Sequence, residues 1–474
     1  MKVAFCAAEV APFSQAGGLG DVAGSLPAAI SRFKSDNPVE IIILTPLYGL
    51  IDRQKYGLVQ TELSFNIQLA GKGYPIGIWQ SQLPNSSVPV YFMENQELFG
   101  DREQVYPYGR PEWELEGFLV FNQAVFELLR RLNFRPDILH VHDWHTGSIA
   151  ATLSDIRPFD QYFSRTYSVL TIHNLSYQGI FGETNCLREG ILKSNAVTTV
   201  SPTYAQEILT PRFGAGLDEV LRGCERKVSG ILNGIDTAHY NPATDSSIPR
   251  HYDVNTVFEG KKACKAALQK TMNLPIDPSI PLVGFVGRLV DQKGLDILLP
   301  AMRKLDEQGI AFQWAFLGSG DPLLEAAVSE WVARSESTGL KIGFDSELAH
   351  QIYAGSDIFA MPSAFEPCGL GQMISMRYGS VPAVHAVGGL ADTIFDVRKH
   401  HPLGNGFRFE EYTAEALVEL FIAAKKLFEN KEEWQALVQR CMRENHSWDN
   451  RAAAYIEFYE QTMKPEPAGS VALG

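Results

Sequence analysis

Cysteine is sparse and scattered in this chain of 474 residues. The six cysteines are Cys6, Cys186, Cys224, Cys264, Cys368 and Cys441. None of them belongs to a C-x-x-C pair, which argues against a zinc site and against a redox-active dithiol. Isolated thiols in a long chain are typical of a reducing compartment, so we expect the protein to be cytoplasmic.

Long apolar runs and an excess of positive charge are also lacking. No stretch reaches the ~18–20 apolar residues of a membrane-spanning helix. The apolar run at residues 3–8 is too short for a signal peptide and ends at Glu9, so we interpret it as a first buried strand. With 41 Lys and Arg against 55 Asp and Glu, the formal net charge is −14. This charge opposes binding to nucleic acid and to anionic membranes, and an anionic ligand would require a local basic pocket.

Short runs rich in Val and Ile recur along the chain, with helical patterns between them. They lie at residues 3–7, 41–44, 138–141, 169–172, 197–200, 282–286, 314–317, 358–361 and 381–384. Runs of this length predict buried parallel strands. Because strands alternate with helices, we expect an α/β fold with doubly wound sheets, whose ligands bind at the carboxyl ends of the strands.

Two loops of similar sequence indicate that the chain has two related halves. Ala16-Gly17-Gly18-Leu19-Gly20-Asp21 resembles Val387-Gly388-Gly389-Leu390-Ala391-Asp392, and each follows a strand-like run. We therefore expect two domains with facing clefts, residues 1–245 and 246–447, with the polar stretch 241–255 as the linker. Residues 448–464 predict a helix that crosses back to the first domain, and the tail 465–474 is expected to be disordered.

The glycine pair Gly17-Gly18 is the first motif that could bind a ligand. Paired glycines after a strand let the backbone approach a ligand, and the helix that follows favours a phosphate. The same pattern also fits a plain structural turn.

The segment 287–294 carries two cations on one loop at the end of a predicted strand. Arg288 and Lys293 could clamp a pyrophosphate there, Arg as a planar fork and Lys as a point charge. A solvated charged turn is the alternative interpretation. Because the loop lies at the carboxyl end of a strand, where ligands of such sheets bind, a binding role is about as well supported as a solvated turn.

A loop rich in Pro, Cys and Gly follows the run 358–361 and contains Glu366. A carboxylate there could accept hydrogen bonds from two vicinal sugar hydroxyls. The N–H groups from Gly369 to Gly371 could face a sugar or a phosphate at the start of a helix. An exposed loop glutamate is usually only solvated, but the crowded surroundings favour a functional role.

Histidine and tryptophan side chains end two strands of the first half. His142-Asp143-Trp144 ends one strand, and His173 ends the other. The H-x-H spacing has no apparent third ligand, so we expect no metal. Trp144 could stack on a sugar or lie in the core. His173 could bind a sugar hydroxyl or serve as a structural histidine.

Together these segments resemble the bacterial glycogen synthase and plant starch synthase family, from the first strand to about Trp448. The motifs that carry the resemblance are Gly17-Gly18-Leu19-x-Asp21, His142-Asp143-Trp144, His173-Asn174-Leu175, Gly287-Arg288, Gln292-Lys293-Gly294, Phe365-Glu366-Pro367-Cys368-Gly369-Leu370 and Gly388-Gly389-Leu390-x-Asp392. The resemblance implies a retaining glycosyltransferase with two Rossmann-like domains facing a central cleft (the GT-B fold), without cofactor or metal. It implies transfer of glucose from ADP-glucose, or from UDP-glucose, to the non-reducing 4-OH of an α-1,4-glucan.

The resemblance also implies roles for individual residues. The expected catalytic residues are His173 near the reacting carbon, Arg288 and Lys293 on the pyrophosphate, and Glu366 on the glucose. The expected donor-binding residues are Gln15, Gly17, Gly18, Cys368, Gly369, Leu370 and Gly371. The expected acceptor-binding residues are Asp21, Asp143 and Trp144.

Three positions depart from the family pattern. Gln15 stands where the family usually has Lys, Gly371 where it has Thr, and His385 where it has Arg or Lys. Each change removes a polar or cationic group, and a charge-assisted hydrogen bond is worth ~1.5–3 kcal/mol. The sequence therefore leaves open an active or slow enzyme and a glucan-binding or regulatory paralogue with little activity. An α-glucan phosphorylase is disfavoured because it needs pyridoxal phosphate on a lysine and usually a longer chain.

Overall fold

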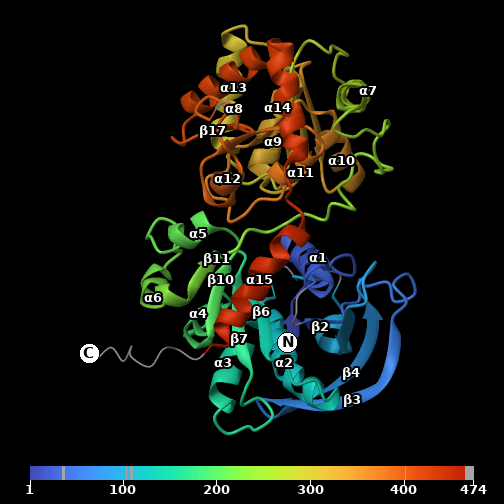
Figure 1. Ribbon diagram of the computed structural model, residues 1–474, viewed down its shortest axis with the longest axis vertical. Helices are drawn as coiled ribbons and strands as arrows, with labels where there is room; N and C mark the ends of the chain where they lie inside the picture. The colour runs from blue at the N-terminus through green and yellow to red at the C-terminus, as the bar shows by residue number, and fades with distance from the viewer. Residues whose placement is uncertain (35–37, 103, 107–109, 401, 465–474) are drawn as a thin grey trace. The chain divides into compact units, whose positions relative to one another are not determined.

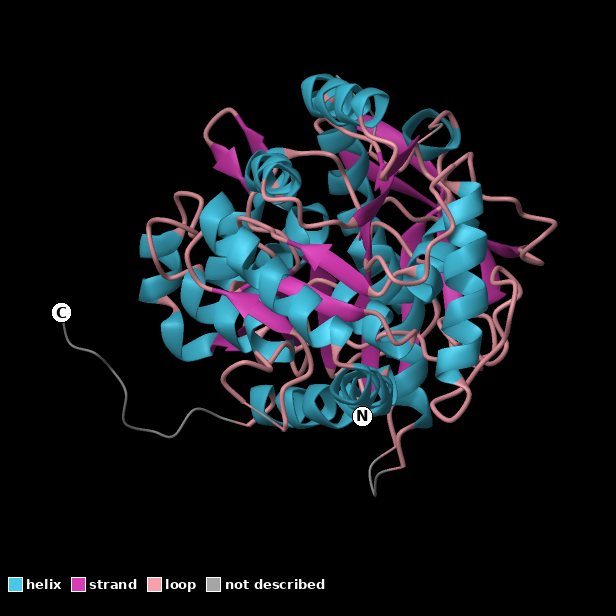
Figure 2. Ribbon diagram, turned by 90° about the horizontal axis from the view of Figure 1, so that it is seen from above, coloured by secondary structure: helices cyan, strands magenta, loops and turns pink. Residues whose placement is uncertain are grey.

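The computed structural model describes residues 1–34, 38–102, 104–106, 110–400 and 402–464. It divides into two compact units (Figure 1): Met1–Gly234 together with the segment from Trp448 onward, and Ile235–Ser447. Each unit contains a largely parallel sheet, and helices flank the strands (Figure 2). The predicted α/β fold with two doubly wound sheets is confirmed.

The sheet of the first unit has the strand order β11-β10-β7-β6-β1-β2-β5-β4-β3. Its strands are β1 (Lys2–Cys6), β2 (Glu40–Pro46), β3 (Val59–Leu69), β4 (Lys72–Gln82), β5 (Pro89–Glu94), β6 (Ile138–His142), β7 (Tyr167–Ile172), β10 (Ala196–Thr199) and β11 (Val228–Gly230). The pairs β3–β4 and β4–β5 are antiparallel, and the other pairs are parallel. A separate hairpin is formed by β8 (Ile180–Phe181) and β9 (Thr184–Asn185).

Strand β1 lies at the centre of this sheet, where the direction of winding reverses between β2 and β6. Its residues Val3–Cys6 are buried, because a central parallel strand is covered on both faces. In the register of the sheet, Phe5 lies between Ile43 and His140. The interpretation of the first apolar run as a buried strand is confirmed, and the exits of β1 and β6 form the switch point where ligands of such sheets bind.

The antiparallel edge formed by β3 and β4 was not predicted. Along β3, exposed residues alternate with half-buried ones, which is typical of a strand with one solvated face. Ala70 and Gly71 join the two strands with φ angles of 50° and 82°. Positive φ at both positions is that of a type I′ hairpin turn.

The first unit's helices include the C-terminal helix of the chain. They are α1 (Gly18–Arg32), η1 (Gln96–Gly100), α2 (Pro111–Arg131), α3 (Asp143–Ile156), α4 (Cys186–Lys193), α5 (Pro202–Glu207), α6 (Asp218–Gly223), η2 (Glu225–Lys227) and α15 (Trp448–Thr462). Helix α15 packs on α1, and Arg32 pairs with Asp449 at 2.9 Å. On β6, the Nδ1 atom of His140 lies 2.7 Å from the hydroxyl of Tyr459.

The sheet of the second unit is parallel, with the strand order β14-β13-β12-β15-β16-β17. Its strands are β12 (Leu282–Val286), β13 (Gln313–Gly318), β14 (Thr338–Ile342), β15 (Ile358–Met361), β16 (Val381–His385) and β17 (Phe407–Phe409). Numbered within the unit, this is the 3-2-1-4-5-6 order of the Rossmann fold. Its switch point lies between β12 and β15, the two strands whose exit loops carry the predicted donor-site motifs.

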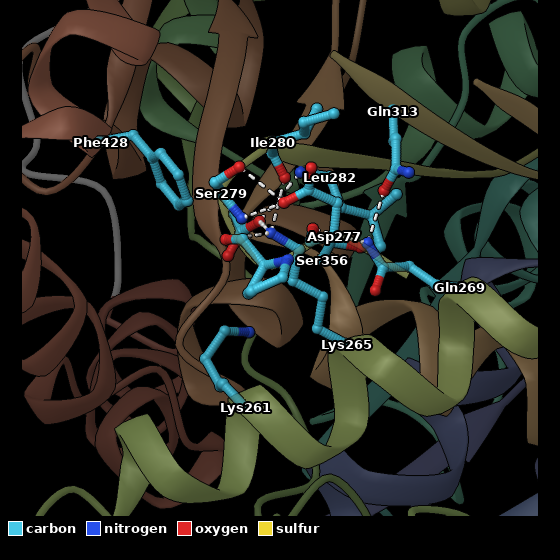
Figure 3. Close-up of polar contacts among 12 residues, drawn as sticks. Lys261, Lys265, Gln269, Asp277, Ser279, Ile280, Leu282, Gln313, Ser356 and Phe428 are labelled. Carbon is cyan, nitrogen blue, oxygen red and sulfur yellow. Dashed lines mark hydrogen bonds and ion pairs between the residues drawn. The ribbon is translucent and has the colours of Figure 1, made fainter. Parts of the chain in front are cut away.

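Helices of the second unit cover this sheet, and α7 is fixed to it by buried polar groups. The helices are α7 (Val257–Thr271), η3 (Asp291–Lys293), α8 (Leu295–Glu307), α9 (Pro322–Arg334), α10 (Ser346–Gly355), α11 (Gly371–Arg377), α12 (Gly388–Thr393), α13 (Ala414–Glu429) and α14 (Lys431–Arg443). Figure 3 shows Lys261, Lys265 and Gln269 projecting from α7. Lys265 forms a buried ion pair of 2.7 Å with Asp357, which precedes β15 and also accepts a hydrogen bond from the N–H of Leu282. This cluster lies at the amino ends of the strands, opposite the predicted donor site.

The boundary between the units differs from the predicted position after residue 245. The units divide between Gly234 and Ile235, because residues after 235 already bond within the second unit. Asp245 is buried and accepts hydrogen bonds from His350 at 2.6 Å and from Tyr378 at 2.5 Å. The polar residues of the predicted linker are therefore partly internal to the unit. The predicted disordered tail 465–474 lies outside the described residues.

Candidate active site

Two loops meet at the switch point of the second unit. The loop after β12 contains Gln292, whose carbonyl accepts a hydrogen bond of 2.9 Å from the N–H of Ala364 in the loop after β15. The Gln292 side chain returns a bond of 3.2 Å to the carbonyl of Phe365. These bonds bring together the two segments that the sequence singled out.

Lys293 and Glu366 form the charged centre of this loop pair. The Nζ atom of Lys293 lies 2.6 Å from Oε2 of Glu366, and Ser363 donates to the same oxygen at 3.0 Å. Glu366 is buried, with 6% of its surface exposed, whereas Arg288 is exposed and bonds to the Gln292 side chain at 3.3 Å. A buried carboxylate paired with one cation, on a loop pair that also carries Arg288, can bind hydroxyl groups and a phosphate side by side.

The second glycine pair packs against the loop that carries Glu366. Gly388 has a φ of 44°, and a Cβ atom there would lie 2.0 Å from the carbonyl oxygen of Glu366. A Cβ atom at Gly389 would lie 2.2 Å from the carbonyl oxygen of Cys368. Both positions need glycine because backbone meets backbone. This glycine pair therefore lets its own backbone pack directly against the backbone of the Glu366 loop.

The remaining predicted donor residues surround the start of α11. Cys368 is buried, Leu370 and Gly371 are half-buried, and Gly369 has a φ of 72°. Gln372, which the sequence did not single out, donates to the carbonyls of Cys368 at 3.1 Å and of Gly369 at 3.0 Å. Its side chain thus fixes the turn that presents the backbone N–H groups.

In the first unit, the loop between β1 and α1 is built around Glu9. Glu9 is 2% exposed, and its Oε2 atom accepts hydrogen bonds from the N–H groups of Ala16 and of Gly17, the latter at 3.0 Å. Burial raises the pKa of Glu9 to about 7, although the two backbone bonds oppose that rise. Sequence reasoning missed Glu9, although an acidic residue at the end of a buried strand was a usable signal.

Glu9 shapes the loop that carries the predicted residues Gln15, Gly17, Gly18 and Asp21. Gln15, Gly17 and Gly18 are exposed, and Asp21 lies half-buried in the first turn of α1. A Cβ atom at Gly18 would meet no other atom within 4 Å. Packing within the protein therefore does not demand glycine there, which favours the interpretation that the backbone must stay accessible.

Asp143 joins the exits of β6 and β7. Its Oδ1 atom accepts hydrogen bonds from the N–H groups of His173 at 2.7 Å and of Asn174 at 3.3 Å. Burial raises the pKa of Asp143 to about 7. Its φ of 52° is unusual for a residue other than glycine, and such strain is often stored at functional sites.

Trp144 lies in the core of the first unit. It is 7% exposed and packs edge-on against Phe118, with ring centroids 5.5 Å apart. A Cβ atom at Gly179 would lie 2.4 Å from the indole ring, so backbone covers this side chain. The structure therefore matches the alternative of a core tryptophan, and the expected stacking face for a sugar is not exposed.

His173 lies half-buried beside a row of histidines. Its Nε2 atom is 3.0 Å from Nδ1 of His142, whose ring is 4.2 Å from the ring of His140. Burial lowers the pKa of His173 to about 3, so its imidazole is neutral at physiological pH. His173, Asp143 and Trp144 therefore lie at the exits of the two strands, as predicted. Of these three, His173 and Asp143 are joined by the hydrogen bond from the N–H of His173 to Oδ1 of Asp143.

Two of the three departures from the family pattern have partners inside the second unit. A Cβ atom at Gly371 would lie 2.9 Å from Cε1 of Phe359, so this ring occupies the space of a side chain. His385 is buried, with its Nδ1 atom 2.7 Å from the carbonyl oxygen of Ser363. Gln15, by contrast, is exposed on its loop, and only there does the substitution remove a charge from an accessible position.

Two kinds of feature are absent from the described residues. Within them, no group of three or more His, Cys, Asp or Glu side chains is arranged to hold a metal ion. In the same part of the chain, no helix has both the length and the apolar character needed to cross a membrane.

Two family profiles match the chain. The profile described as "Starch synthase catalytic domain" matches residues 2–223, and "Glycosyl transferases group 1" matches residues 271–440. The chain is 41% identical to glycogen synthase of Geotalea daltonii, with 98% of this chain and 99% of the relative covered. It is 40% identical to glycogen synthase of Streptococcus agalactiae, with 97% and 100% covered.

Solved structures show the same similarity. The catalytic domain of starch synthase IV from Arabidopsis thaliana, solved with ADP and acarbose bound, has a TM-score of 0.88 and 32% identity. That match covers 98% of this chain and 99% of the other. Sucrose-phosphate synthase from Thermosynechococcus elongatus, at 16% identity and a TM-score of 0.61, shares the fold. The chain belongs to the glycogen synthase and starch synthase family of glycosyltransferases.

Proposed function

We propose that the chain transfers glucose from ADP-glucose to the non-reducing 4-OH of an α-1,4-glucan, with retention of configuration. The observation that carries this proposal is the buried Lys293–Glu366 pair at the switch point of the second unit, with Arg288 on the same loop. The starch synthase IV structure at 32% identity contains ADP and acarbose, which supports an adenine donor and a glucan acceptor. UDP-glucose remains the alternative donor.

The second unit, Ile235–Ser447, is proposed to bind the nucleotide sugar. Arg288 and Lys293 would bind the diphosphate, on which negative charge develops as the glycosyl–phosphate bond breaks. Fixed cations stabilise that charge without reorganising during the reaction. Glu366 would accept hydrogen bonds from glucose hydroxyls, and the N–H groups near Gly369 and Gly371 would face the donor.

The Lys293–Glu366 pair itself prepares both side chains for these roles. Because Glu366 is 6% exposed, leaving its charge without a partner would be costly. The ammonium group of Lys293 neutralises the carboxylate of Glu366, and the carboxylate in turn fixes the position of the Lys293 side chain. Since a lysine ammonium has three donor hydrogens, it can keep this contact and still bind a phosphate oxygen.

The first unit, Met1–Gly234 with α15, is proposed to supply the acceptor side. Asp143 orders the turn at His173, and His173 would meet the glucose near the reacting carbon. On the loop that Glu9 fixes, Gly17 and Gly18 are proposed to contact the donor, and Asp21 is proposed to contact the acceptor. Trp144 is proposed to stabilise the exit of β6 by packing against Phe118, because its ring is buried.

Retention is proposed to proceed by attack on the same face that the diphosphate leaves. The sugar then acquires oxocarbenium-like charge, and the leaving phosphate helps to deprotonate the acceptor hydroxyl. Because burial lowers the pKa of His173 to about 3, its imidazole is a weak base, which favours the leaving diphosphate as the group that takes this proton. Exclusion of water would prevent hydrolysis of the donor.

An active enzyme accounts for the three departures better than an inactive paralogue does. Gly371 and His385 are matched by internal partners, Phe359 and the Ser363 carbonyl, so they are built into this unit's packing. Only Gln15 removes a charge from an exposed loop. The full-length identity of about 40% to proteins named glycogen synthase likewise favours the enzyme. The isolated thiols, which are all free, support a cytoplasmic location.

Extension of a defined acceptor tests this function. Purified chain is incubated with maltoheptaose and either ADP-glucose or UDP-glucose, and products are resolved by length and by the anomeric proton signals of the new linkage. We expect longer maltooligosaccharides with new α-1,4 linkages from ADP-glucose. Unchanged maltoheptaose with both donors, from protein that still binds glycogen, would rule the proposal out in favour of a glucan-binding paralogue.

A further inference from the structure

His142, the last residue of β6, makes an unusual pair of contacts. Its ring is fully buried and lies against Phe5 and His140, with centroid distances of 4.2 Å to each. On one side, its Nδ1 atom is 3.0 Å from Nε2 of His173. On the other side, its Nε2 atom is buried and has no hydrogen-bond partner among the described residues.

The two facing nitrogens of His142 and His173 can share a hydrogen bond in only two ways when both rings are neutral. If His142 carries its proton on Nδ1, it donates to His173, and the buried Nε2 of His142 is a bare acceptor. If His173 donates instead, His142 carries its proton on Nε2 and buries an N–H group without a partner. Because buried N–H groups without partners are rarer than buried acceptors without partners, the first arrangement is favoured.

The neutral state of both rings follows from their surroundings. Burial lowers the pKa of His173 to about 3 and that of His142 well below the usual range, and the neighbouring His140 lowers the pKa of His142 further. Asp143 reaches His173 only at its backbone N–H. Among the described residues, the ring nitrogens of His140, His142 and His173 have hydroxyl or imidazole partners and no carboxylate partner.

We propose that His142 is a positioning residue that holds His173 in the tautomer with its proton on Nδ1. His173 then acts toward the sugar as a hydrogen-bond donor and cannot act as a base through that nitrogen. Its partner must be a hydrogen-bond acceptor on the hexose, either a hydroxyl oxygen or the ring oxygen. This second step rests on the proposed function, whereas the tautomer is a property of the protein alone.

Nuclear magnetic resonance tests the tautomer directly. The full chain is labelled with ¹⁵N-histidine, and long-range proton–nitrogen spectra are recorded without ligand. The His173 signals are assigned by their loss in His173→Gln. We expect the protonated nitrogen of His173 to be Nδ1 in the native chain and to shift toward Nε2, the form that free histidine prefers, in His142→Phe. A native His173 protonated on Nε2 would overturn the proposal, whether or not the protein transfers glucose.

Kinetics separate positioning from simple packing. His142→Phe retains an aromatic ring in the core and removes the donor, and we expect kcat to fall about 10- to 100-fold, by analogy with the groups that orient metal-bound histidines. His142→Asn can retain an N–H group near the Nδ1 position and should recover kcat to within a few-fold of native. The KM for the glucan should change little in both variants.

His140 provides the matched control, because it lies in the same stack and is equally buried but makes no hydrogen bond to His173. His140→Phe should lower thermal stability, leave the His173 tautomer on Nδ1 and keep kcat near native. If His140→Phe does not fold, His140→Asn serves instead, since it retains polar contacts. Equal losses of kcat in the His140 and His142 variants, without a tautomer change, would show packing alone and overturn the positioning role.

Discussion

Lys293 and Glu366 form an ion pair of 2.6 Å between the exit loops of β12 and β15. The two residues come from loops more than 70 positions apart in sequence, and the parallel sheet places both loops at its switch point. Their side chains are 19% and 8% exposed, so solvent screens the pair less than it screens a surface ion pair. The ion pair therefore links Lys293, the proposed ligand of the diphosphate, to Glu366, the proposed ligand of the glucose.

Glu366→Gln should lower kcat/KM by about 10- to 150-fold, which corresponds to the ~1.5–3 kcal/mol of a charge-assisted hydrogen bond. The amide is neutral and can neither compensate Lys293 nor accept as strongly from glucose hydroxyls. Initial rates of glucose transfer measure the effect. Lys304→Ala is the control, because Lys304 pairs with Glu415 on the surface, where both side chains are well exposed. A similar loss in the control would contradict a specific role for the buried pair.

Glu9→Gln should make the protein more stable than native at pH 8. Because the folded-state pKa of Glu9 is raised to about 7 from 4.5, its contribution to stability is present below pH 4.5 and lost as pH rises to about 7. A glutamine oxygen can still accept from the N–H groups of Ala16 and Gly17, so the gain at pH 8 should be ~1–3 kcal/mol. Urea unfolding at pH 5 and pH 8 measures it.

Glu62→Gln is the control for this pH series, since Glu62 is exposed on β3. It removes a carboxylate from the surface and not from the interior, so we expect no gain in stability at pH 8 like that of Glu9→Gln. Asp143, whose pKa is also raised to about 7, should keep part of that dependence in Glu9→Gln. If the free energy of unfolding depends on pH in the same way in Glu9→Gln and in the native chain, ionisation of Glu9 does not destabilise the folded state, which would contradict the prediction.

Gln15→Lys should raise the rate with ADP-glucose by about tenfold or more, because it adds a charge-assisted contact to an anionic donor. Gln15 is exposed, so the longer side chain has room. Gln60→Lys makes the same charge change at an exposed position on the edge strand β3 and should have no effect. A rate that stays the same or falls in Gln15→Lys would mean that Gln15 is adapted to another ligand.

Gly371→Thr should destabilise the second unit by ~1–3 kcal/mol, the usual cost of overpacking. Its Cβ atom would lie 2.9 Å from Phe359 and 3.3 Å from Sδ of Met361. Phe359→Val should make room, so the double variant should be more stable than the sum of the single effects predicts. Chemical denaturation of the four proteins measures this coupling, and additive effects would refute the steric account.

The sequence predicted the parallel strands β1, β2, β6, β7, β10, β12, β13, β15 and β16, because each is a short, continuous apolar run. It did not predict β5, β11, β14 and β17, which also have parallel partners. It missed β3 and β4, whose mixed polar and apolar residues suit one solvated face. It placed the unit boundary too late, because the polar segment around Asp245 finds its partners, His350 and Tyr378, only in the folded unit. Polarity alone does not distinguish a linker from a segment with buried hydrogen bonds.

The candidate site was predictable where a motif follows a parallel strand, as for Lys293 and Glu366. Glu9 was missed, and His142 was named only as part of its motif, because their contacts depend on partners that no spacing reveals, namely backbone N–H groups and the ring of His173. The second glycine pair shows that a likeness in sequence does not fix the packing. Gly388-Gly389 resembles Gly17-Gly18, but Gly388 and Gly389 accommodate the carbonyls of Glu366 and Cys368, whereas Gly18 meets no such neighbour.

Incorporation of labelled glucose into glycogen shows whether the chain is a glucan synthase. The native chain and Glu366→Gln are assayed side by side with ADP-[¹⁴C]glucose, and glycogen binding of both proteins is measured in parallel. We predict steady incorporation by the native chain and a loss of about 10- to 150-fold in the variant. No incorporation by a native chain that still binds glycogen would contradict the account.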